Sequence, residues 1–179
     1  MLIDLLKKLQ RDGACAAVYS RRGKQNRFSF GRIASVSDAH YIFSSLAPRG
    51  TDDGWVLCEI SDIPRVEVGT KYAQRMSVLS RNTPHSPIAF DEGNLVEALL
   101  RHAMRNNYVT AVDVLNSDSG ITGFVKTLSD DGVAEIAQIN RYGETDGVSY
   151  IFVADITYIS CHSEDEQVIE RLLAGKSNP

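Results

Sequence analysis

The spacing of apolar residues changes along the chain between a helical and a strand period. Positions three and four apart repeat over Leu2–Leu9, where Gly13 is a stop signal, and again over Leu95–Met104. Shorter amphipathic stretches cover Tyr72–Leu79 and Val168–Leu173. These spacings predict that each half of the chain opens with a helix and closes with an amphipathic stretch.

Short apolar runs between the helices are bounded by Gly, Asn and Asp, which are typical of turns. We therefore expect five short strands in each half. Pro64 has no backbone N–H, so the strand that contains it should lie at a sheet edge. The predicted strands are Ala14–Tyr19, Phe28–Val36, His40–Leu46, Trp55–Ile60, Ile63–Val68, Val109–Leu115, Gly123–Leu128, Val133–Ile139, Gly147–Val153 and Ile156–Cys161.

Turn residues of the first half recur in the second half at a nearly constant offset of 92 or 93 positions. An internal repeat of this kind indicates a tandem duplication of one module of about eighty residues. The predicted division is a basic module at 1–79, a linker at 80–90 that contains two prolines, and an acidic module at 91–179. The matched pairs are Gly31 with Gly123, Ser37 with Ser129, Gly50 with Gly143, Asp53 with Asp146, Gly54 with Gly147 and Asp62 with Asp155.

A helix followed by five short strands is the layout of a small open barrel. Each module resembles the Sm/LSm-like proteins, a family of ring-forming, RNA-binding barrels. The resemblance rests on Gly123–Val125, Ser129–Asp131, Gly147 and Phe152–Ile159, and on their counterparts Gly31–Ile33, Ser37–Asp38 and Glu59–Ile63. It implies a mainly β fold with helices (α+β) that consists of two tandem helix-plus-five-strand small open barrels.

The nucleotide-pocket residues of that family are not matched. RNA-binding members carry an Asn after the acidic turn, where this chain reads Val133–Ile136. They also carry an Arg-Gly pair before the last strand, where this chain has Val153-Ala154 and Ile60-Ser61. The resemblance therefore supports a fold and offers little support for the family's base-binding pocket.

Charge differs between the two halves. Residues 1–90 carry a net charge of +5 and residues 91–179 a net charge of −9. The predicted hairpin between the first two strands concentrates the cations, and Phe28 and Phe30 follow it. Cations beside aromatic residues are typical of an anion or nucleic-acid site. The candidate site residues are Arg21, Arg22, Lys24, Arg27, Arg32, Phe28 and Phe30.

No residue pattern indicates catalysis, a metal site or a cofactor. Cys15, Cys58 and Cys161 are too widely spaced for a metal-ligand motif and give no disulfide framework. The adjacent pair Cys161-His162 should point to opposite faces of a strand, which does not suit thiol chemistry. We therefore expect neither catalytic nor metal-binding residues.

Three functional hypotheses follow. The favoured one is a non-enzymatic, cytoplasmic binding or assembly module that acts as a protein-interaction scaffold, with an unidentified protein partner or a second copy of itself. The alternative is weak, sequence-tolerant nucleic-acid binding through the basic hairpin. An enzyme with a site between the modules is the third. The chain has no run of about 18 apolar residues, so we expect no membrane partner.

Overall fold

The computed structural model describes residues 1–179 except 22–27, 82, 84–89, 91–92, 118–119 and 177–179. The described part divides into two compact units, Met1–Leu95 and Val96–Pro179. The predicted boundaries at 79/80 and 90/91 stay a prediction. Most of the linker, at 82 and 84–89, lies outside the described residues.

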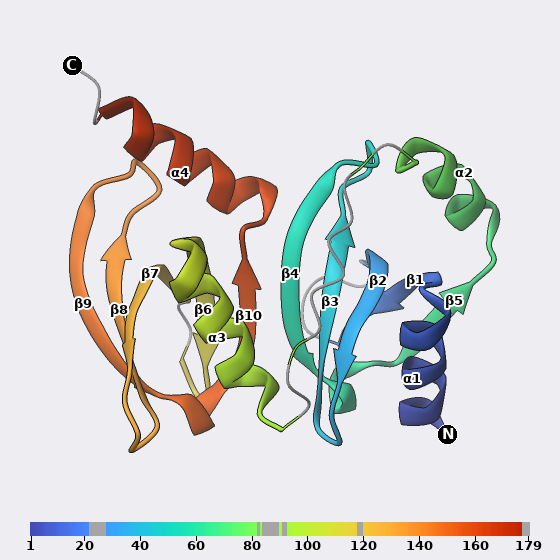
Figure 1. Ribbon diagram of the computed structural model, residues 1–179, viewed down its shortest axis with the longest axis horizontal. Coiled ribbons are helices and arrows are strands. Elements are labelled where there is room, and N and C mark those ends of the chain that lie inside the picture. The colour runs from blue at the N-terminus through green and yellow to red at the C-terminus, as the bar shows by residue number, and fades with distance from the viewer. Residues whose placement is uncertain (22–27, 82, 84–89, 91–92, 118–119, 177–179) are drawn as a thin grey trace. The chain divides into compact units, whose positions relative to one another are not determined.

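The first unit contains five strands and two helices (Figure 1). Helix α1 ends at Gly13, which adopts a left-handed conformation (φ +59°) as the stop signal predicted. Thr70 caps α2 by accepting a hydrogen bond from the Ala73 N–H (3.1 Å). The elements are α1 (Leu2–Asp12), β1 (Cys15–Tyr19), β2 (Phe28–Val36), β3 (His40–Leu46), β4 (Asp52–Glu59), the 3-10 turn η1 (Ile60–Asp62), β5 (Arg65–Val68) and α2 (Lys71–Leu79).

Strands of the first unit pair antiparallel in the order β5-β1-β2-β3-β4. Strand β5 ends this order, so the edge position predicted from Pro64 is confirmed. Leu6 and Leu9 of α1 pack against Ile33, Val36 and other apolar residues of the sheet. A second cluster joins Met76 of α2 to Phe30, Ala17 and Leu46.

The second unit has the strand order β10-β6-β7-β8-β9, again antiparallel. Ser163 and Glu166 form a capping box at the start of α4, since each side chain accepts a hydrogen bond from the other residue's N–H. The elements are α3 (Leu95–Asn106), which starts at the last residue of the first unit, β6 (Val109–Val114), β7 (Ile121–Leu128), β8 (Val133–Ile139), β9 (Thr145–Phe152), η2 (Val153–Asp155), β10 (Ile156–Cys161) and α4 (Glu164–Lys176).

The prediction of two tandem Sm-like barrels is wrong, although a mainly β fold with helices is confirmed. The strands form open antiparallel sheets, and among the described residues no pairing joins β4 to β5 or β9 to β10. Strand positions follow from local sequence, whereas closure depends on whether distant end strands meet, which the alternation of apolar residues does not encode.

Both units use a glycine where two neighbouring strands approach closely. A Cβ on Gly31 in β2 would lie 2.0 Å from the Ser44 carbonyl oxygen in β3, and one on Gly123 in β7 would lie 2.1 Å from that of Ala137 in β8. Neither distance is possible between real atoms, so any side chain would force the strands apart. The two glycines occupy matched positions of the sequence repeat.

We expect Gly31→Ala and Gly123→Ala each to lower the free energy of unfolding by at least about 1–3 kcal/mol, the cost of overpacking a tight site. Denaturant titration followed by circular dichroism measures the change. Gly175→Ala is the matched control, because its Cβ meets no atom within 4 Å and Ala favours a helix. Wild-type stability in both strand variants would contradict the close approach.

Candidate functional site

The structure places only part of the predicted basic site. Arg22, Lys24 and Arg27 lie outside the described residues. The two described cations both bind backbone oxygens. Arg21 Nη1 donates to the Ser61 carbonyl (2.5 Å), and Arg32 Nε donates to the Gly13 carbonyl (3.3 Å). Both arginines therefore also hold the fold of the first unit together.

Phe28 and Phe30 lie on the same face of β2, and both contact the Tyr72 ring of α2 edge-on, with centroids 5.2 and 5.3 Å away. Phe30 is a core residue, whereas 37% of Phe28 is exposed. The Tyr19 ring lies 5.2 Å from Phe28, and the Arg65 guanidinium stacks 3.7 Å above Tyr19. Together these side chains form a row of rings that runs from the core to the surface.

Cys161 and His162 take different structural roles at the end of β10. Cys161 is buried, and burial raises the pKa of its thiol far above the usual range, with the Glu166 carboxylate adding to the effect. His162 has a left-handed backbone (φ +59°), which is uncommon for a residue other than glycine. Its Nδ1 lies 3.0 Å from a Glu170 carboxylate oxygen.

Glu170 also accepts a hydrogen bond from the Val109 N–H (2.8 Å), so one carboxylate connects α4, the start of β6 and His162. The Tyr108 ring stacks on His162 at 4.0 Å, and His102 of α3 lies 5.8 Å from Tyr108 on a tilted plane. No short motif in the sequence indicates this cluster, because its members lie up to 68 positions apart.

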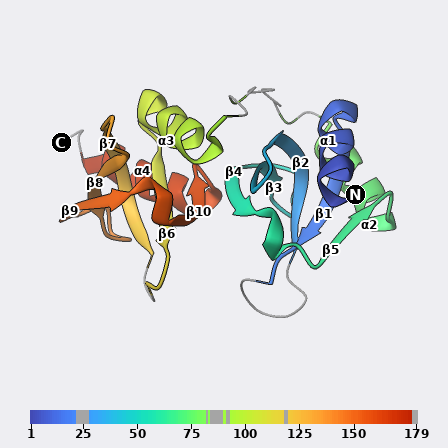
Figure 2. The ribbon, with the colours of Figure 1, turned by 90° about the horizontal axis from the view of Figure 1, so that it is seen from below.

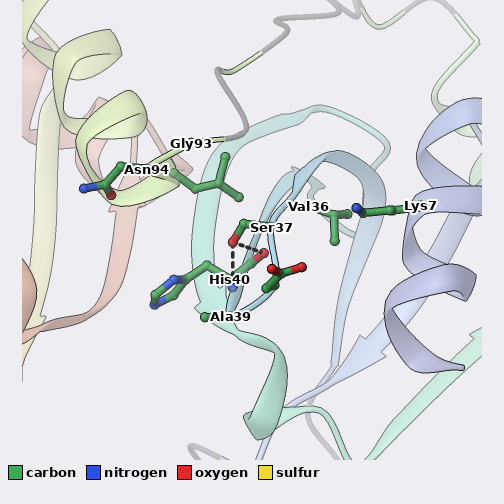
Figure 3. Close-up of a pocket in the computed structure, with 9 residues that line it drawn as sticks. Lys7, Val36, Ser37, Ala39, His40, Gly93 and Asn94 are labelled. Atoms are coloured by element: carbon green, nitrogen blue, oxygen red, sulfur yellow. Dashed lines mark hydrogen bonds between the residues drawn. The ribbon is translucent and has the colours of Figure 1, made fainter.

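Within the described residues, no group of three or more His, Cys, Asp or Glu side chains could hold a metal ion. A cavity of about 380 Å³ adjoins the turn between β2 and β3 in the first unit (Figure 3). Ser37 Oγ and the backbone of His40 exchange hydrogen bonds across this turn. Burial lowers the pKa of His40, partly offset by Glu59. The polar atoms of Ser37 therefore stabilise the turn.

The most unusual surface belongs to β9. Three large side chains at alternate positions point outward, with exposed fractions of 50% for Val148, 70% for Tyr150 and 62% for Phe152. Between them only Ile151 is buried, at 6%. A strand that covers a core usually turns its large apolar residues inward and its polar residues outward. Strand β9 instead turns Val148, Tyr150 and Phe152 outward and places Ile151 inward.

The neighbouring strands extend this surface. In register, Phe152 lies opposite Val133, Tyr150 opposite Glu135 and Val148 opposite Ala137 on β8. Ala137 in turn pairs with Phe124 on β7, whose ring lies 5.2 Å from Lys126 Nζ. We call the side chains of Val148, Tyr150 and Phe152 together with Val133, Ala137 and Phe124 the outer face. It is a mainly apolar sheet surface at the end of the strand order, with Glu135 opposite Tyr150 in its middle.

Comparison of the chain with protein-family models, curated proteins and solved structures finds no match. Among the described helices, none has the length and apolar character to cross a membrane. The class of protein is therefore defined by its own geometry, which is an open antiparallel sheet with an exposed apolar outer face.

His102 gives a test of the cluster in the second unit. Burial, then the charges of Arg105 and His162, lower its pKa below 6.5. The folded protein thus binds fewer protons at His102 than the unfolded chain does. Stability from neutral His102 is fully present above pH 6.5 and is lost as the pH falls through the folded pKa.

We expect an NMR titration of the His102 imidazole to give a pKa below 6.5. We expect the His102→Gln variant to show a smaller decrease in unfolding free energy as the pH falls below 6.5. His40→Gln should have the same effect on the first unit, because burial also lowers the pKa of His40. A measured His102 pKa at or above 6.5 would contradict the burial of this side chain.

Proposed function

We propose that this chain is a non-enzymatic, cytoplasmic protein-interaction module whose outer face docks a partner protein. One observation carries the proposal, namely the exposure of Val148, Tyr150 and Phe152 in a row on β9. Single exposed apolar residues are common on proteins, whereas a contiguous apolar patch is typical of an interface.

The energetics favour a protein partner. Burial of one side chain of this size stabilises by about 1.5–3 kcal/mol, and aromatic residues are common among those that dominate binding energy. Tyr150 and Phe152 supply two aromatic anchors on a regular strand. Because the strand backbone is held by β8 along its length, these anchors lose little conformational freedom when a partner binds.

The non-enzymatic part of the proposal has separate support. The thiol of Cys161 is held protonated by burial, so the thiolate that catalysis needs is disfavoured. The carboxylate of Glu170, which lies 3.0 Å from His162 Nδ1, already accepts a hydrogen bond from the Val109 N–H. His162 and Glu170 therefore connect α4 to the start of β6.

Photocrosslinking from the outer face tests the proposal in cells that produce the protein. With p-benzoylphenylalanine in place of Tyr150, we expect one discrete protein adduct that disappears when Val148→Ser and Phe152→Ser are added. Tyr142 is the matched control position, since it is 58% exposed but lies in the turn before β9. Equal adducts at both positions, or adducts that survive the two substitutions, would rule out docking on the outer face.

Nucleic-acid binding by the first unit is the second candidate, because a half-exposed Phe28 stands between Tyr19 and Tyr72 beside a segment rich in cations. Bases stack on such rings with little sequence preference. The net charge of −9 on residues 91–179 opposes it by repelling phosphate. This candidate therefore ranks below protein docking.

Binding to single-stranded oligonucleotides should weaken with salt, and the steepness is the slope of log K against log salt concentration. Replacing Arg22, Lys24 and Arg27 with Gln should reduce this slope by about 2–3, because each lost phosphate contact removes roughly 0.7–0.9. Fluorescence anisotropy at low salt measures the slope. A control triple variant, Lys126→Gln with Arg141→Gln and Arg171→Gln, should leave it unchanged. If the parent protein binds no oligonucleotide, this candidate is lost.

A further inference from the structure

The partner's chemistry can be inferred from β9, and this inference rests on the proposed function. β9 pairs with β8 on one side and ends the strand order of its unit. On such an edge, every second backbone N–H and C=O points away from the sheet and can pair with another strand. The edge of β9 is therefore a template for strand addition.

Strand β5, which ends the strand order of the first unit, carries the features by which proteins guard an edge. It has four residues, follows Pro64, and includes the charged Arg65 and Glu67, which lie 3.5 Å apart. By contrast β9 has eight residues and contains neither Pro nor Lys. Its only charged residue, Asp146, precedes the bend at Gly147 (φ +89°). The run Val148–Phe152 is thus an unguarded edge.

Side chains of an added strand would alternate like those of β9. Neighbouring strands lie about 4.7–4.9 Å apart, so every second side chain of the newcomer would stand beside Val148, Tyr150 and Phe152. These neighbours are apolar and exposed, and cross-strand apolar and aromatic pairs are stabilising. The incoming segment should therefore have apolar residues at alternate positions.

Acidic residues lie near both ends of β9. Glu144 and Asp146 lie at the start of β9 and are exposed. At its other end, the Val153 N–H donates to the Gly132 carbonyl (2.8 Å), which brings the turn with Asp130 and Asp131 beside the end of β9. Glu135 lies opposite Tyr150 in the middle. The flanks of the incoming segment should therefore be basic.

A second copy of the chain fits this surface poorly. Pairing of β9 with another β9 would bring the same carboxylates together in two acidic units. Pairing with β5 of another copy would offer only a short strand with charged residues at alternate positions. We propose that β9 binds, by strand addition, an extended segment of a different protein in which alternate residues are apolar and the flanking residues are Lys or Arg.

A synthetic probe tests the proposal on the full chain. The peptide acetyl-Lys-Lys-Val-Thr-Ile-Thr-Val-Lys-Lys-amide should slow amide hydrogen exchange over residues 148–152. It should bind at least about tenfold more tightly than the same peptide with Glu flanks, and this difference should shrink as salt screens the charges. Tyr150→Ser should weaken binding, whereas Tyr142→Ser should leave it unchanged.

Three results would overturn the proposal. The first is equal affinity for the Lys-flanked and Glu-flanked peptides at low salt. The second is that N-methylation of alternate amides of the Lys-flanked peptide leaves its affinity unchanged. The third is no binding of the Lys-flanked peptide at about 1 mM. Concentration-dependent protection of residues 148–152 without peptide would show that the occupant is a second copy. If Tyr150 adducts form in cells while the peptide fails, only the inferred chemistry of the partner falls; if adducts also fail, so does the proposed function.

Discussion

The close approach of two backbones at a glycine is the contact on which each sheet depends. At Gly31 and at Gly123 the neighbouring carbonyl occupies the space of a Cβ, so the two central strands of each unit touch without an intervening side chain. Register shifts follow within a few residues in both pairs. Such bulges increase twist, and the strands of both units curve accordingly (Figures 1 and 2). Because each sheet is curved, its concave face covers apolar side chains. The opposite face of β9, which carries Val148, Tyr150 and Phe152, is exposed.

Helices at the ends of the units hold this curvature at matching turns. Gly50 follows β3 with φ +82°, and a Cβ at this position would lie 2.7 Å from Leu79 at the end of α2. Gly143 follows β8 with φ +69°, and a Cβ at this position would contact Leu172 and Leu173 of α4. The helix thus packs on the turn before the last long strand of each unit. In the second unit that strand is β9, so the position of the outer face depends on α4, and α4 in turn depends on Glu170 and the capping box.

Local sequence predicted the elements well because turn residues and apolar runs act locally. The strands His40–Leu46, Val133–Ile139 and Ile156–Cys161 have the expected bounds, and Gly13 ends α1. The prediction of two tandem Sm-like open barrels was wrong, because how far a sheet curls toward a barrel depends on the arrangement of strands that are distant in sequence. The outer face was missed because Val148–Phe152 reads Val-Ser-Tyr-Ile-Phe, with apolar residues on both faces, so periodicity could not choose which of them the core would cover. The contact of Tyr108 with His162 joins residues 54 positions apart and leaves no local signal.

Strands β5 and β9 differ in the features that guard a sheet edge. Selection against aggregation favours guarded edges, and β5 has that form in its length, its charges and the proline before it. An unguarded edge such as Val148–Phe152 costs solubility, so we expect it to serve an interaction. In the proposed complex, the acidic groups around β9 limit pairing between identical copies by like-charge repulsion and attract the basic flanks of the incoming segment. In this proposed complex the net charge of residues 91–179 thus selects the partner, and the apolar row of β9 binds it.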